Sequence, residues 1–184
     1  MALALLAIAP GSEARPQTSE PYRCPASFAA LLSARTFGDY AVKLPAGRLK
    51  PVAPDVRVGQ THLYRTAIRA AAKAGPDFAG HYTVIRIGCG AATICVAIAD
   101  TQTGKIYFPS ALRNATALLV DTLGADVDTL NYRRNSRLLI VIGSPNENPK
   151  RAGVSYYVWR SGELSLLRFT PAAALCSLPP STQF

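Results

Sequence analysis

Apolar and turn residues alternate in the second half of the chain, a pattern typical of strands joined by hairpins. Residues 84–89, apolar apart from Arg86, and the apolar residues 94–99 are separated by Gly90-Ala91-Ala92-Thr93. A polar turn at residues 100–105 then leads to a third apolar segment at 106–108, which Pro109 ends. These segments predict two successive hairpins that share their middle strand.

Two more pairs of strands are predicted toward the C-terminus. Residues 131–134 and 136–142 flank a polar turn, and residues 154–160 and 163–169 flank the two-residue turn Ser161-Gly162. In the last hairpin a single register brings together one pair of opposite charges and two aromatic–aliphatic pairs, which favours that register. The three pairs are Arg160 with Glu163, Trp159 with Leu164, and Tyr157 with Leu166.

A helical period occurs in two places nearer the N-terminus. Residues 25–35 carry Phe28, Leu31 and Leu32 at helical spacing, and a second helix is predicted from Thr61 to Ala74, where Gly75-Pro76 ends it. The inner stripe of the second helix consists of Tyr64, Ile68, Ala71 and Ala72. Its outer face carries Arg65, Arg69 and Lys73.

The remaining segments give weaker signals. Glycines and prolines between residues 36 and 60 predict irregular structure with one strand at 40–44, and a short helix is one interpretation of residues 111–119. The whole pattern predicts an α+β fold, an antiparallel sheet of about six or seven hairpin-connected strands with one or two packed helices.

Length and composition fit one globular domain. The chain has 184 residues, of which 49% are hydrophobic and 17% charged, so a core can form and general disorder is excluded. No apolar run is long enough to predict a membrane span. We assign residues 24–184 to the single disulfide-stapled domain and the polar residues 15–23 to a flexible leader.

The first residues resemble the apolar centre of a secretory signal. Residues 1–9 are apolar, Pro10-Gly11 interrupts them, and Ser12-Glu13-Ala14 offers the small residues that a signal peptidase prefers. We therefore expect residues 1–14 to be the remainder of a signal peptide, and the protein to be periplasmic or secreted in a bacterium. An ordinary apolar N-terminus is the alternative.

The four cysteines, Cys24, Cys89, Cys95 and Cys176, all follow this segment, and an even number in an exported domain suggests two disulfides. Cys89 and Cys95 are equidistant from Ala92, so a hairpin centred there places them opposite one another, about 4.5–5.5 Å apart. This pairing leaves Cys24 with Cys176. No C-x2-C pair is present, so we expect neither a zinc site nor any other metal or cofactor.

Basic residues exceed acidic ones by 20 to 11, which gives a formal net charge of +9. A positive surface attracts polyanions such as phospholipid headgroups or cell-wall acids. The candidate anion-binding residues form two groups, Arg65, Arg69 and Lys73 on the helix, and Arg133, Arg134 and Arg137 with Lys150 and Arg151 among the strands. Four aromatic residues could add a stacking platform: Tyr132, Tyr156, Tyr157 and Trp159. The competing interpretation is a solvated helix face, with the aromatic side chains in the core.

Three sequence blocks resemble a family of small exported bacterial proteins with no established activity. They are Phe78-Ala79-Gly80-His81-Tyr82, Gly88-Cys89-Gly90 followed by Cys95, and Asp100-x-x-Thr103-Gly104-Lys105. The resemblance covers approximately residues 61–169 and implies an exported soluble domain with a common fold, but no catalytic residue. The spacer between the two cysteines is longer and more apolar here than in the family.

Catalytic candidates are Cys89, His81, His62, Asp100 and Asp77. His81 and Cys89 lie eight residues apart on one predicted strand, about 26 Å, so they cannot form a nucleophilic pair. His81 could act alone as an acid or base near Asp77 and Tyr82, which makes a periplasmic hydrolase or other enzyme the alternative function. We favour an envelope binding module whose basic surface binds an anionic polymer or a partner protein. Nucleic acid is not expected as a ligand, because the protein is predicted to be exported.

Overall fold

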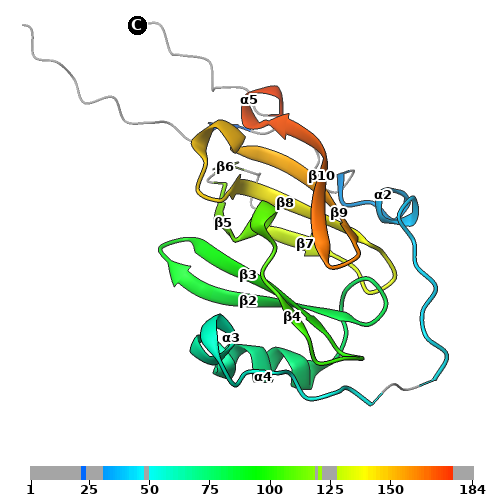
Figure 1. Ribbon diagram of the computed structural model, residues 1–184. Coiled ribbons are helices and arrows are strands. Elements are labelled where there is room, and N and C mark those ends of the chain that lie inside the picture. Colours follow the sequence, from blue (N-terminus) through cyan, green and yellow to red (C-terminus); the bar gives the residue numbers. More distant parts are fainter. Residues whose placement is uncertain (1–21, 24–30, 48–49, 119, 122–127, 176–184) are drawn as a thin grey trace, which may run out of the picture.

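A computed structural model describes residues 22–23, 31–47, 50–118, 120–121 and 128–175. Its centre is an open sheet of eight antiparallel strands (Figure 1). The strands are β2 (Tyr82–Gly90), β3 (Thr93–Asp100), β4 (Ile106–Tyr107), β5 (Asn114–Ala117), β7 (Leu130–Tyr132), β8 (Leu138–Pro145), β9 (Gly153–Arg160) and β10 (Glu163–Pro171). The short strands β1 (Tyr22–Arg23) and β6 (Val120–Asp121) pair in parallel in a separate two-stranded sheet.

The order across the large sheet is β10-β9-β8-β5-β3-β2, with β4 paired to β3 and β7 paired to β8. Helices are few and short. In the described residues they are α2 (Ala34–Gly38), α3 (Gly59–Leu63), α4 (Arg65–Ala74) and α5 (Ala172–Leu175), with short 3-10 helices at Ser110–Leu112 and Pro149–Arg151. The antiparallel sheet is therefore confirmed, with eight strands instead of about six or seven, but the fold is mostly β rather than a balanced α+β, because the helices are few and short.

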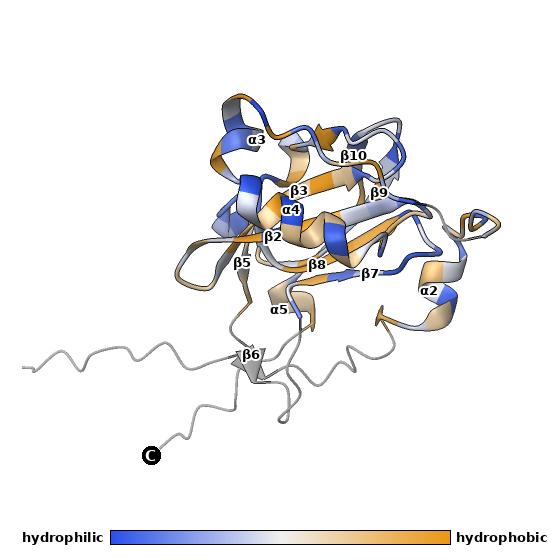
Figure 2. Ribbon diagram, turned by 90° about the horizontal axis from the view of Figure 1, so that it is seen from below, coloured by the Kyte–Doolittle hydropathy of each residue, from blue (hydrophilic) through white to orange (hydrophobic). Residues whose placement is uncertain are grey.

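Apolar residues lie on both faces of the sheet. One face forms the main core, which includes Phe78, Ile98, Leu139, Tyr157 and Trp159. The other face is covered in two parts. Helix α4 packs over β2 and β3 with Ile68 fully buried, and α2 packs over β8 and β9 through Phe37. The two helices thus sit over different parts of one sheet (Figures 1 and 2).

The last hairpin has the register that the sequence predicts. Arg160 lies opposite Glu163, Trp159 opposite Leu164, and Tyr157 opposite Leu166. The turn residues Ser161 and Gly162 both have positive φ, 50° and 87°, as the hairpin turn that matches strand twist requires. The local pairing was predictable because the turn length fixes the register.

The predicted helix at residues 61–74 is divided. Helix α3 ends at Leu63, Tyr64 has a non-helical backbone (φ −99°, ψ 17°), and α4 continues to Ala74. The inner stripe is confirmed, since Ile68 and Ala72 are buried and Tyr64 and Ala71 pack against the same cluster. Gly75 ends α4 with a φ of 91°.

Two other predicted elements differ from the structure, and a third lies mostly outside the described residues. The described residues 111–118 do not form a helix, since a single 3-10 turn is followed by β5, which pairs with β3 and β8. The predicted strand at 40–44 is reduced to one bridge, between Ala41 and Ser136. The helix predicted at 25–35 lies mostly outside the described residues, and a separate short helix, α2, begins near its predicted end, at Ala34. In the first two cases the backbone finds partners in distant parts of the chain that local spacing does not reveal.

The β2–β3 hairpin also pairs in a different register from the predicted one. Cys95 lies opposite Ile87, and Arg86 lies opposite Val96 rather than Ile98. One position of this shift arises because Gly90 pairs with Thr93, so the turn is centred between Ala91 and Ala92, and the other because a bulge between Gly88 and Gly90 adds a residue to β2. The shift is two residues, so the apolar face that the sequence predicts, with Ile85, Ile87, Ala97 and Ala99, is preserved.

Candidate functional site

Two of the sequence blocks, Phe78–Tyr82 and Asp100–Gly104, lie side by side, because Tyr82 at the start of β2 pairs with Asp100 at the end of β3. Thr101 donates both its backbone N–H (3.0 Å) and its hydroxyl (2.5 Å) to the carbonyl oxygen of His81. The carboxylate of Asp100 accepts the backbone N–H groups of Gln102 (2.8 Å) and Thr103 (3.3 Å). The blocks therefore form one structural junction.

His81 belongs to this junction but has a different partner from the expected one. Its Nε2 atom lies 3.7 Å from Oδ1 of Asp100, beyond hydrogen-bond distance, and its ring lies 4.2 Å from that of Tyr82. Asp77 instead accepts the backbone N–H of Val84 (2.9 Å) and the hydroxyl of Tyr132 (3.3 Å). Burial raises the pKa of Asp77. His81 thus has Tyr82 beside it, as expected, and the carboxylate recorded within 4 Å of its ring is that of Asp100, in place of the expected Asp77.

Cys89 and Cys95 form a disulfide with a Cα–Cα distance of 5.7 Å. The pairing agrees with the prediction, but Cys89 reaches Cys95 diagonally from the bulge rather than from the opposite position. The bond removes Cys89 as a nucleophile. Cys24 and Cys176, the second expected pair, lie outside the described residues.

The second group of basic residues is not one surface. Arg133 and Arg134 lie in the turn between β7 and β8, where Arg133 donates to the carbonyl oxygen of Leu32 (2.8 Å) and Arg134 to that of Gly80 (3.5 Å). Arg137 precedes β8 and has its Nε atom buried. Lys150 and Arg151 lie beyond the other end of β8, a strand about 26 Å long.

The aromatic residues do not form an exposed platform either. Tyr156, Tyr157 and Trp159 are buried in the core, and Tyr132 is half-buried at its edge. Ring-to-ring contacts hold Trp159 against Tyr82 (5.3 Å) and Tyr107 (5.4 Å). These aromatic side chains therefore belong to the core and its edge, which is the competing interpretation given by the sequence.

The first group of basic residues does form a continuous exposed surface. Arg65, Arg69 and Lys73 lie along the outer side of α4, and the Arg65 guanidinium donates to the carbonyl oxygen of His62 (3.1 Å), which connects this row to α3. Two apolar side chains at the ends of α3 are open to solvent, Val58 just before the helix (76% exposed) and Leu63 in its last turn (69% exposed). These five residues are called the α3–α4 face, and Figure 2 shows both helices outside the sheet.

The charge of this face is not neutralised by neighbouring acids. Within the described part of the chain, none of its three bases forms an ion pair with a carboxylate. The nearby Asp55 pairs with Arg57 through two hydrogen bonds of 2.9 Å, which lower the pKa of Asp55 to about 2. The carboxylate of Asp55 is therefore already paired with Arg57 and does not neutralise the α3–α4 face.

A cavity of about 500 Å³ between α2 and strands β8, β9 and β10 was not predicted. Its charged residues Arg35, Asp39 and Arg168 come from opposite ends of the described chain. No local motif joins them, so only the packing of α2 on the sheet could have revealed this site.

Comparison of the chain with protein-family models, with curated proteins and with solved structures finds no match, so the functional argument rests on the geometry of the chain itself.

Proposed function

We propose that the protein is an exported binding module of the bacterial envelope, which attaches to anionic envelope material through the α3–α4 face. The observation that carries the proposal is the combination of three exposed bases in one row on α4 with two exposed apolar side chains at the ends of the adjoining helix α3. The formal charge of +9 supports attraction to a negative surface from a distance. In the described residues, no helix is long and apolar enough to cross a membrane.

The expected affinity is modest. A base near an anionic lipid surface contributes about 1 kcal/mol, so the row contributes about 3 kcal/mol. Full burial of Val58 and Leu63 in the interface would add about 1.5–3 kcal/mol each. The apolar residues separate two classes of ligand, because a lipid interface can bury them and a highly hydrated anionic polymer cannot.

The test is co-sedimentation of the full chain with vesicles of phosphatidylcholine alone or mixed equally with phosphatidylglycerol. We expect binding to the mixed vesicles at low salt and release at high salt, since the screening length falls from about 10 Å at 0.1 M to about 3 Å at 1 M. Arg65→Glu/Arg69→Glu should weaken binding at least tenfold. The matched control is Lys150→Glu/Arg160→Glu, which changes the net charge equally but on exposed residues at the ends of β9, far from α4 in the sheet.

Two outcomes would overturn the proposal. One is the absence of binding at low salt both to mixed vesicles and to an immobilised anionic polymer. The other is equal weakening by the two double variants, which would show a general charge effect. An enzyme built around His81 would instead lose turnover of an envelope substrate in His81→Ala, with little response to salt.

A further inference from the structure

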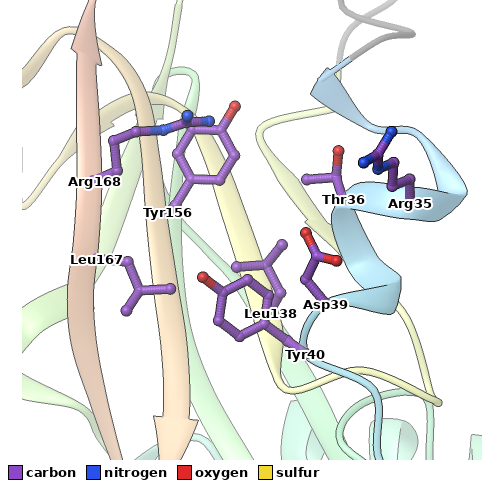
Figure 3. A pocket seen from close by; sticks show the side chains of 8 residues that line it. All are labelled: Arg35, Thr36, Asp39, Tyr40, Leu138, Tyr156, Leu167 and Arg168. Carbon is purple, nitrogen blue, oxygen red and sulfur yellow. The ribbon is translucent and has the colours of Figure 1, made fainter.

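The cavity between α2 and the sheet brings together charged and polar groups that are separate from the α3–α4 face (Figure 3). Helix α2 and the residues that follow it supply one wall, with Arg35, Thr36, Asp39 and Tyr40. Leu138 of β8, Tyr156 of β9, and Leu167 and Arg168 of β10 supply the other. The volume, about 500 Å³, is in the range of small-molecule sites.

The sheet wall is shaped by a bulge in β10. The pairing passes from Leu166 opposite Tyr157 directly to Arg168 opposite Tyr156, so Leu167 is an extra residue. The bulge thereby places Arg168 on the same face of the sheet as Tyr156, and its guanidinium lies 4.2 Å from the centre of the Tyr156 ring. Bulges commonly redirect a side chain in this way near binding sites. The cation–π contact holds the guanidinium at the cavity.

The helical wall is fixed by three hydrogen bonds. Ser33 accepts the backbone N–H of Thr36 (3.2 Å), which caps α2, and its hydroxyl also bonds that of Thr36 (2.9 Å). The fully buried Ser136 donates its hydroxyl to the carbonyl oxygen of Phe37 (2.8 Å), which ties α2 to the residues before β8. Both walls are thus held in place by contacts with the core.

The charged groups of the cavity remain available for a ligand. Arg35, Asp39 and Arg168 are exposed, and in the part of the chain that the structure describes none of them forms an ion pair. A guanidinium binds a carboxylate or phosphate through two parallel hydrogen bonds. A carboxylate such as Asp39 can only accept, and it therefore suits the hydroxyl groups of the same ligand. Leu167, which is 42% exposed, offers apolar surface.

We propose that this cavity binds an acidic sugar, with its carboxylate or phosphate toward Arg35 and Arg168 and its hydroxyls toward Asp39. Anionic group, hydroxyls and apolar ring face are the three chemical features that the two walls match. A free inorganic anion would leave Asp39 and Leu167 unused. The cavity shares no residue with the α3–α4 face, so the inference goes beyond the proposed function and can be tested independently of it.

The experiment is isothermal titration of the full chain with four probes: glucuronate, glucose 6-phosphate, glucose and inorganic phosphate. We expect glucuronate or glucose 6-phosphate, or both, to bind at least tenfold more tightly than glucose or phosphate, and their ratio to identify the preferred anionic group. Arg168→Gln should weaken binding of the acidic sugar at least tenfold, and Asp39→Asn should weaken it severalfold. The matched control is Arg160→Gln, an exposed arginine on the neighbouring strand outside the cavity, which should bind normally.

Several results would overturn the inference. Equal affinity for glucose would remove the role of the arginines, and equal affinity for inorganic phosphate would indicate a simple anion site. Failure of both acidic sugars to bind, or normal binding by Arg168→Gln with its fold verified by circular dichroism, would also refute it. Arg65→Glu/Arg69→Glu should leave sugar binding unchanged, which separates this test from that of the α3–α4 face.

Discussion

Gly104, at the end of the Asp100–Gly104 block, provides a quantitative test of whether this block is structural. Its backbone has a φ of 76°, a conformation that side chains rarely adopt. A Cβ atom there would also overlap the carbonyl oxygen of Ala53 and approach Cγ1 of Val52 to 3.3 Å. We therefore expect Gly104→Ala to destabilise the protein through two separate causes.

The magnitude follows from these causes. The positive φ costs about 1–2 kcal/mol in a residue other than glycine. Relief of the overlap requires the segment 52–55 to move, and two hydrogen bonds hold that segment: Val52 donates to the carbonyl of Thr101 (2.8 Å) and Asp55 to that of Gly104 (3.0 Å). A backbone shift of this kind costs about 1–3 kcal/mol. The total is about 2–5 kcal/mol.

Two other glycines separate the contributions. Gly75 has a positive φ of 91°, but a Cβ atom added to it would meet no atom within 4 Å, so Gly75→Ala tests the backbone cost alone. Gly88 has neither a positive φ nor a close neighbour, so Gly88→Ala should be neutral or stabilise by up to about 1 kcal/mol. The stability order should be Gly88→Ala, Gly75→Ala, Gly104→Ala, from most to least stable.

The assay is urea unfolding followed by the fluorescence of Trp159, the single tryptophan, which is 2% exposed. The midpoint should fall for Gly104→Ala without a change in slope, which would indicate a loss of stability in an unchanged fold. If Gly104→Ala costs no more than Gly75→Ala, the steric argument is wrong. If it costs no more than Gly88→Ala, the whole account of the block is wrong.

Three further predictions concern the disulfide, the buried Ser136 and the carboxyl group of Asp77. Cys89→Ser/Cys95→Ser should lower the free energy of unfolding by about 2 kcal/mol, because the unfolded chain is no longer restricted by the short loop that the disulfide closes. Reduction of the wild type should give a similar loss in thermal melts. Ser136→Ala leaves the carbonyl of Phe37 and the N–H of Leu138 without this partner, so we expect a loss of about 1–3 kcal/mol by urea unfolding, whereas the exposed Ser165→Ala should stay within about 0.5 kcal/mol. The raised pKa of Asp77 means that the folded protein holds this proton more tightly than the unfolded chain, so its contribution to stability decreases as pH rises from about 4 through the folded-state pKa. Asp77→Asn, which cannot titrate, should lack that part of the pH dependence, and identical pH profiles of the two melting temperatures would contradict the assignment.

The sequence by itself determined the features that depend on neighbouring residues. The register of the β9–β10 hairpin follows from a two-residue turn and three matching cross-strand pairs, and the buried side of α4 follows from the spacing of Ile68 and Ala72. The pairing of Cys89 with Cys95 was also accessible, because both lie on one hairpin. These signals act over a few residues, where the backbone leaves few alternatives.

Only the tertiary structure decided which distant residues meet. The strand β5 forms through its partners in β3 and β8, and His81 lies near Asp100 because Tyr82 pairs with Asp100. The bulges in β2 and β10 insert single residues whose position depends on packing across the sheet. The cavity of Arg35 and Arg168 arises in the same way, since long-range burial brings α2 onto the sheet and no periodicity along the chain records that contact.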